Sequence, residues 1–131
     1  MRTAVVTGAS RGIGSEFVVR LLDAGWKVYA GYRSDLLRLE LINNHNLVCQ
    51  RLDVTDNNSI SEFVKIIDND VDLLINNAGV PDGRWRNIKE IDDEWMLEVL
   101  NINSVGPVRM VKALYDKMNH KSLTTVAMIS S

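Results

Sequence analysis

The sequence predicts an α/β fold with a doubly wound parallel sheet, and three observations support this prediction. Five short apolar runs are distributed along the 131 residues. Between most of them lie segments with helical apolar spacing, a pattern typical of βαβ units with right-handed crossovers. A glycine-rich turn, residues 7–14, separates the first run from the first helical segment. We therefore expect a single domain whose five strands lie in the order 3-2-1-4-5.

The first half of the chain supplies three of the expected strands. These are residues 1–7, 27–31 and 47–52, each short, apolar and bounded by turn residues. A helix from Ile13 to just before Gly25 would place one apolar face against the sheet, formed by Ile13, Phe17, Val18, Leu21 and Leu22. A second, leucine-rich helix is expected over residues 36–42.

The second half is expected to add two strands, residues 71–75 and 123–129. Ser59-Ile60-Ser61-Glu62 fits a capping box that would begin the helix between the third and fourth strands. Asp92 is the predicted N-cap of the next helix, which Gly106-Pro107 should interrupt. The apolar stripe that follows contains Val108, Val111, Leu114, Tyr115 and Met118. Core packing is the simplest role for this stripe, and a contact between subunits is the alternative.

The glycine-rich turn has the features of a phosphate-binding loop. Gly8 would let the chain leave the strand sharply, Gly12 would let the backbone approach a pyrophosphate, and Gly14 would let the helix pack on the sheet. The N–H groups at the helix start would face the anion. A second turn, residues 76–79, should open at the same switch point of the sheet. The pattern favours a Rossmann-type dinucleotide site, with a purely structural turn as the alternative.

Composition and charge argue against several classes of function. The net charge is −2, with both signs interspersed, so there is no basic stripe for nucleic acid or an anionic membrane. No apolar stretch approaches membrane-spanning length and no signal peptide is completed, so we expect a cytoplasmic protein. The single cysteine, Cys49, is expected to be a buried small side chain. His45 and His120 lack neighbouring ligands at metal-site spacing, so no metal site is expected.

Charge at the end of the second strand predicts which dinucleotide is bound. An NAD site usually has an acidic residue there to bind the ribose 2′-hydroxyl. This chain has Arg33 at that place, and Arg11 in the glycine-rich turn could join it on a 2′-phosphate. We therefore expect NADP(H) to be favoured over NAD(H). Asp35 argues against this preference, because a shifted turn could bring its carboxylate to the ribose, although its position after Ser34 suits a helix start. As a further alternative, both arginines could be solvated surface charges.

Taken together, the motifs resemble the short-chain dehydrogenase/reductase family. The resemblance rests on five places in the family's order: residues 7–14, Asp53-Val54, Asn76-Asn77-Ala78-Gly79, Asn103 and Ile129-Ser130-Ser131. It implies that the cofactor contacts Gly8, Ser10, Arg11, Gly12, Ile13 and Gly14 in the glycine-rich turn. It further implies that Asp53 accepts from the adenine amino group and Val54 lines the adenine pocket. Asn77, Ala78 and Gly79 would run beside the adenine ribose and brace the sheet.

Two of these assignments have local alternatives. Asp53 could instead cap the following helix. Asn76 and Asn77 could bond only to neighbouring backbone, as turn residues often do, and this can coexist with cofactor contact. Trp85 and Trp95 are expected to pack in the ordinary way, with lining of a substrate pocket as the alternative.

The resemblance also implies a catalytic set, which this chain holds only in part. Asn103 would support a water-linked proton relay and Ser131 would hold the substrate oxygen. The family's Tyr-x-x-x-Lys pair is missing, because Tyr29, Tyr32 and Tyr115 are each followed four residues later by a residue other than lysine. We expect the chain to be the N-terminal portion of a longer, homo-oligomeric oxidoreductase that acts on a small carbonyl or alcohol. The alternatives are a catalytically incompetent nucleotide-binding or interaction module and a product without a stable fold.

Overall fold

The computed structural model describes residues 1–81, 83, 85–118 and 124–130, and its centre is a parallel sheet. Five strands lie in the order β3-β2-β1-β4-β5, as the sequence predicts. The strands are β1 (Thr3–Val6), β2 (Lys27–Tyr32), β3 (Leu47–Arg51), β4 (Leu73–Asn76) and β5 (Thr125–Met128). The winding direction reverses between β1 and β4, where Val5 lies beside Leu74 and Val6 beside Ile75. The carboxyl ends of these two strands therefore open at one switch point.

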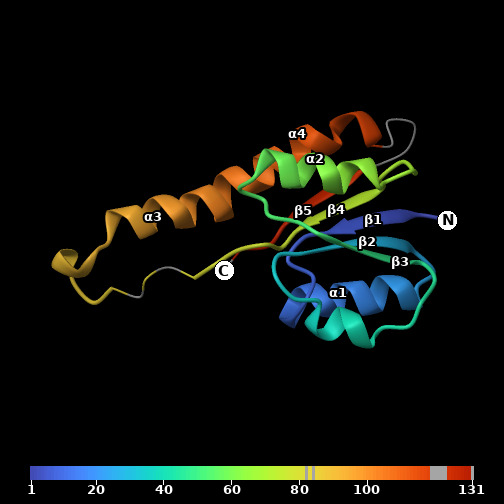
Figure 1. The fold of residues 1–131 in the computed structure, drawn as a ribbon, viewed down its shortest axis with the longest axis horizontal. Coiled ribbons are helices and arrows are strands. Elements are labelled where there is room, and N and C mark those ends of the chain that lie inside the picture. Colours follow the sequence, from blue (N-terminus) through green and yellow to red (C-terminus); the bar gives the residue numbers. More distant parts are fainter. Residues whose placement is uncertain (82, 84, 119–123, 131) are drawn as a thin grey trace.

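Helices cover both faces of the sheet. Helix α1 (Gly12–Asp23) lies on one face, and α2 (Asn57–Lys65) and α4 (Gly106–Leu114) lie on the other (Figure 1). Helix α3 (Asp93–Leu100) continues the line of α4 away from the sheet, and none of its residues is buried (Figure 1). Within the described residues, no helix combines the length and apolar character needed to cross a membrane.

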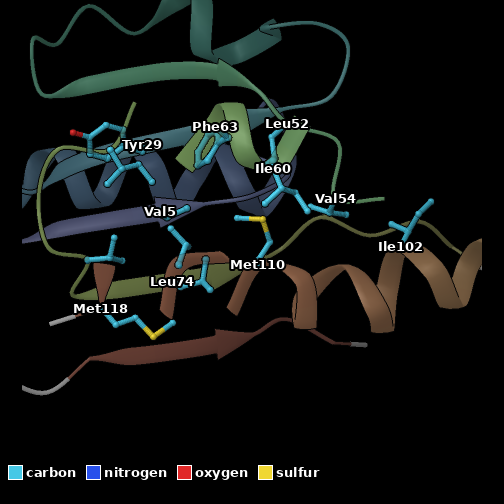
Figure 2. Packing of buried hydrophobic residues seen from close by; sticks show 13 residues of the cluster. Val5, Tyr29, Leu52, Val54, Ile60, Phe63, Leu74, Ile102, Met110 and Met118 are labelled. Atoms are coloured by element: carbon cyan, nitrogen blue, oxygen red, sulfur yellow. The ribbon is translucent and has the colours of Figure 1, made fainter. Parts of the chain in front are cut away.

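Two hydrophobic clusters hold the layers together, one on each side of the sheet. Strand β1 is buried along its whole length, so its alternate side chains enter different clusters. Val6 packs with Val18 of α1, whereas Val5 belongs to the cluster that includes Phe63 of α2 and Met110 of α4. Figure 2 shows the second cluster, with Tyr29 and Met118 at one end and Val54 and Ile102 at the other.

The helix expected over residues 36–42 is wrong in type and length. The chain forms a 3₁₀ turn at Leu37–Leu41, and its first residue, Leu37, lies in the left-handed region at φ 46°. Only Leu39 of this turn is buried, and its side chain joins the cluster under α1. Leucine content favours a helix, but Leu39 is the only fully buried side chain of this turn, and Leu36 and Ile42 on either side pack only partly against the same cluster.

The capping box predicted at residues 59–62 is also wrong. Helix α2 begins earlier, and Asp56 is its N-cap, accepting a hydrogen bond from the Asn58 N–H at 2.9 Å. The Ser59 hydroxyl instead accepts from the Asp53 N–H at 2.8 Å. Asp92 does cap α3 as predicted, because its carboxylate accepts from the N–H groups of Glu94 and Trp95.

Gly106-Pro107 does not break the helix that contains Asn103. Helix α3 passes into a π-helical turn, Asn101–Val105, and then directly into α4. Pro107 comes shortly after the π-turn, where the regular hydrogen-bond pattern of the α-helix is already interrupted, so its missing N–H removes no bond from a regular α-helical ladder. The predicted stripe is divided: Leu114 and Met118 are buried, whereas Val108 and Tyr115 are exposed.

Two further expectations about burial need correction. Ile13 does not lie on the buried face of α1, since 62% of it is exposed at the first turn of that helix. Cys49 is only partly buried on β3, and burial raises the pKa of its thiol. On β5, which forms one edge of the sheet, Val126 and Met128 are exposed.

Candidate cofactor-binding and catalytic site

The glycine-rich turn brings three segments of backbone into close contact. Gly8 has φ 59°, and a Cβ there would lie 2.8 Å from the Cα of Ala78. A Cβ on Gly14 would collide with the carbonyl oxygen of Gly8 and lie 2.6 Å from Nδ2 of Asn77. Side chains at these two positions would force the turn after β1 away from α1 and from the turn after β4.

The start of α1 is built to face an anion. Arg11 is its N-cap residue and makes no side-chain hydrogen bond to the helix. The first N–H groups of a helix have no intrahelical acceptor and carry the positive end of its dipole. Gly12 has φ 56°, and a Cβ at this position would meet nothing within 4 Å. The donors therefore border open space of the kind that a phosphate group fills.

Thr7 joins the two turns at the switch point. Its buried hydroxyl accepts from the Asn77 N–H at 3.0 Å and from the Ala78 N–H at 2.9 Å. The Asn77 side chain donates in return to the Gly8 carbonyl at 3.0 Å. Asn77 thus joins the turn after β4 to the turn after β1, while Ala78 and Gly79 line a cavity.

A cavity of about 400 Å³ lies beyond the glycine-rich turn. It is lined by Gly8, Ser10, Arg11, Arg33, Ser34, Asp35, Leu37 and Val80. Arg11 and Arg33 are exposed and border the same space, although they lie 22 residues apart in the sequence. Asp35 borders it as well, so both the basic and the acidic candidates for the ribose 2′ position are present.

A smaller cavity lies between Gly8, Asp53, Val54, Ala78 and Gly79. Asp53 does not cap α2: its Oδ1 accepts from the Thr55 N–H at 2.9 Å and from the Thr55 hydroxyl at 2.7 Å. Burial alone would raise the pKa of Asp53, but the bonds from Thr55 and the nearby guanidinium groups of Arg33 and Arg51 outweigh it, so the pKa is lowered. Asp53 is thus a charged acceptor beside the cavity.

A third cavity, of about 650 Å³, lies at the carboxyl end of β4 and β5. Its lining residues are Ile13, Asn76, Ala78, Asn103, Ser104, Pro107, Val108, Met128, Ile129 and Ser130. The amide of Asn103 is held by the backbone of Val80, since its Oδ1 accepts from the Val80 N–H and its Nδ2 donates to the Val80 carbonyl, each at 2.8 Å. Ser131 lies outside the described residues.

The three cavities adjoin one another. Gly8 borders the first and second, and Ala78 borders the second and third. The uncapped start of α1 borders the first cavity through Arg11 and the third through Ile13, and the pocket beside Asp53 adjoins both. A dinucleotide needs such an arrangement, because its pyrophosphate joins the adenine half of the molecule to the nicotinamide half. The residues present fit such a cofactor.

Sequence reasoning missed two contributors to this site. Ile102 lines the pocket beside Asp53, and Arg109 bonds to the backbone of Val54 at 3.0 Å. Asn76, which the sequence analysis names in its motif, lines the pocket beside Asn103. Nothing in the local sequence pattern pointed to Arg109.

Comparisons with known proteins agree with this geometry. Residues 2–131 match the sequence model of a family described as short chain dehydrogenase. The chain is 32% identical to (+)-neomenthol dehydrogenase of Arabidopsis thaliana, over 99% of this chain and 53% of that protein. It is 31% identical to acetoacetyl-CoA reductase of Rhizobium meliloti, over 99% of this chain and 55% of that protein. The chain thus spans about half the length of these curated relatives.

Solved structures show the same arrangement. Serine dehydrogenase from Escherichia coli superposes with a TM-score of 0.83 at 27% identity, covering 95% of this chain and 59% of that one. The NADPH-bound carbonyl reductase from chicken fatty liver superposes with a TM-score of 0.79 at 32% identity, covering 88% and 50%. The sheet order, the glycine-rich turn and the sequence match together show that this chain belongs to the short-chain dehydrogenase/reductase family.

Proposed function

We propose that this domain is the NADP(H)-binding part of an oxidoreductase that interconverts a small carbonyl and its alcohol. The observation that carries the proposal is the pair Arg11 and Arg33 on one cavity wall, next to the uncapped start of α1. The cofactor supplies or accepts a hydride at its nicotinamide C4. Among the solved structures similar to this chain, the carbonyl reductase from chicken fatty liver is described as NADPH-bound.

In this proposal the residues of this chain bind the cofactor and orient it. The N–H groups at the start of α1 hold the pyrophosphate, Ser10 and Ile13 flank it, and Asp53 accepts from the adenine amino group beside Val54. Asn77, Ala78 and Gly79 support the adenine ribose. Asn103, fixed by Val80, faces the cavity where the substrate would meet the nicotinamide.

The proton donor is the part of the proposal that lies beyond this sequence. We assign Ser131 to the substrate oxygen and the donor to a Tyr-x-x-x-Lys pair beyond residue 131. The intact mass of the polypeptide from its native source, compared with the 14.7 kDa of these residues, tests this assignment. A mass near twice that value supports it. A mass of 14.7 kDa would instead favour the nucleotide-binding module without turnover.

Cofactor preference is tested by exchanging the charge at position 33. Each charge-assisted bond to a phosphate contributes about 1.5–3 kcal/mol, or roughly one to two powers of ten in affinity. Arg33→Asp should therefore weaken NADPH binding about 10- to 100-fold and leave NADH binding unchanged or tighter. The measurement is the ratio of the two dissociation constants by fluorescence titration. Arg20→Met is the control, because Arg20 is exposed and pairs only with Glu16 in the described structure. Unchanged selectivity in Arg33→Asp would refute the assignment.

We also propose that the protein is a cytoplasmic homo-oligomer. The continuous helical run from α3 to the 3₁₀ turn after α4 exposes several large apolar side chains, namely Leu97, Leu100, Val108 and Tyr115. Sedimentation equilibrium of the full-length protein tests the association. A monomer at micromolar concentration would contradict this part of the proposal.

A further inference from the structure

The helix that carries Asn103 contains a π-helical turn at Asn101–Val105. In this wider turn the N–H of Gly106 donates to the carbonyl of Asn101. Such turns are rare, and they occur mostly as single bulges inside α-helices, frequently at functional sites. The turn changes the direction of Asn103 relative to the helix axis. A contact that holds the turn in place therefore also holds the Asn103 amide.

Arg109 makes that contact from the first turns of α4. Its Nη2 donates to Oδ1 of Asn101 at 2.6 Å, and its Nη1 donates to the carbonyl of the same residue at 3.3 Å. That carbonyl is the acceptor that closes the π-turn. A guanidinium can reach both oxygens because it presents several N–H donors in one rigid plane.

The same guanidinium also reaches the adenine side of the site. Nη1 donates to the carbonyl of Val54 at 3.0 Å, and Val54 lines the cavity beside Asp53. The start of α4 is packed tightly here, since a Cβ on Gly106 would lie 2.7 Å from Cγ2 of Val54. Arg109 therefore connects the wall of the adenine pocket with the turn that directs Asn103.

We propose that Arg109 is a positioning residue: it fixes the π-turn, and through it the Asn103 amide, against the backbone of the adenine pocket. The Asn103 amide is exposed, and its partners in the described structure are the N–H and carbonyl of Val80, at 2.8 Å each. Val80 belongs to the loop after β4, so these two bonds alone do not fix the direction of the helix. Arg109 supplies a third point of attachment. This inference has a structural half, that Arg109 holds the π-turn, and a catalytic half, that Arg109 thereby positions Asn103 for the reaction. The catalytic half rests on the proposed function.

The structural half is tested on the full-length protein without cofactor. Hydrogen exchange by mass spectrometry should show that Arg109→Met accelerates exchange of amides 101–106 at least tenfold, with little change in α1. Arg20→Met is the matched control, because it removes a guanidinium that bonds only within α1 in the described structure and should leave these amides unchanged. Unchanged exchange in Arg109→Met would overturn the inference. If that variant fails to fold, Asn101→Ala removes one of the three bonds and should accelerate exchange of the same amides, and unchanged exchange there would overturn it equally.

The catalytic half is tested by combining variants. If Arg109 acts through Asn103, Arg109→Met should lower kcat at least tenfold in the wild-type background and less than twofold in an Asn103→Ala background. The dissociation constant of NADPH should change less than threefold, and Arg109→Lys should recover part of kcat because an ammonium still donates to one of the three oxygens. An equal loss of kcat in both backgrounds would overturn the positioning role. A wild-type protein that neither binds nor oxidises NADPH would overturn the catalytic role together with the proposed function, while the exchange result would still decide the structural half.

Discussion

Replacing Thr7 with valine should separate the two turns that form the site. The hydroxyl of Thr7 is the acceptor for two backbone N–H groups, those of Asn77 and Ala78, at 3.0 and 2.9 Å. Valine has nearly the same shape, so it fills the same space in the sheet but accepts no hydrogen bond. The variant therefore tests these two bonds and not the packing of Thr7, which is 1% exposed.

The expected magnitude follows from the surroundings of the two N–H groups. A buried donor that loses its acceptor costs about 1–3 kcal/mol, so two donors would cost about 2–6 kcal/mol. Asn77 and Ala78 are only partly buried, so water can reach their N–H groups and the low end applies. We expect a loss of about 2 kcal/mol in the free energy of unfolding, which is a large share of the stability of an ordinary domain.

Urea unfolding of the full-length protein measures this loss. With a typical dependence on denaturant, the midpoint of Thr7→Val should fall by about 1 M. Thr7→Ser keeps the hydroxyl and removes one methyl group, so it should retain most of the stability and should bind NADPH more tightly than the valine variant. A midpoint for Thr7→Val within about 0.2 M of the wild-type value would refute the reasoning. So would a serine variant as unstable as the valine variant.

Two further substitutions test the same region. Gly14→Ala places a methyl group against the Gly8 carbonyl, so it should cost about 1–3 kcal/mol in the free energy of unfolding, measured by urea titration, and should weaken NADPH binding. Asp53→Asn tests the lowered pKa of Asp53. Because that pKa is lower in the folded than in the unfolded chain, the carboxylate stabilises the fold above about pH 4 and loses this contribution as the pH falls through the folded pKa. Thermal unfolding at pH values from 2 to about 6 should therefore show a shallower acid loss in Asp53→Asn than in the wild type. If the melting temperatures of the two proteins fell in parallel as the pH is lowered, the lowered pKa of Asp53 would be contradicted.

The sheet could be predicted from the sequence because each strand is short, apolar and bounded by turn residues. Residues 3–6 and 73–76 lie at the buried centre, where a continuous apolar run has few alternatives. The switch point then follows from the strand order, and so does the meeting of the turns after β1 and β4. The positions of Gly8, Gly79 and Asn103 around one set of cavities could thus be predicted without coordinates.

The segments that connect the strands were harder to predict from the sequence, because tertiary contacts there override the local preference for helix or turn. Residues 36–42 have helical composition, yet Leu39 is buried while Leu36 and Ile42 pack only partly, and the segment closes as a 3₁₀ turn. Ser59 fits a capping pattern, but Asp56 lies one turn earlier and takes the N-cap, which leaves the serine hydroxyl free to accept from Asp53. Ile13 fits the apolar period of α1 but falls on the side that faces a cavity.

The π-turn shows most clearly what a sequence pattern leaves undetermined. Arg109 bonds to it from eight residues after Asn101, about two helical turns away. A side chain at that spacing is not an immediate neighbour on an ordinary helix, where partners are three or four residues apart. Arg109 reaches Asn101 while also bonding to Val54, a residue from a different crossover of the fold. The direction of Asn103 is therefore set by a contact between two βαβ units, and it arises only when the units pack together.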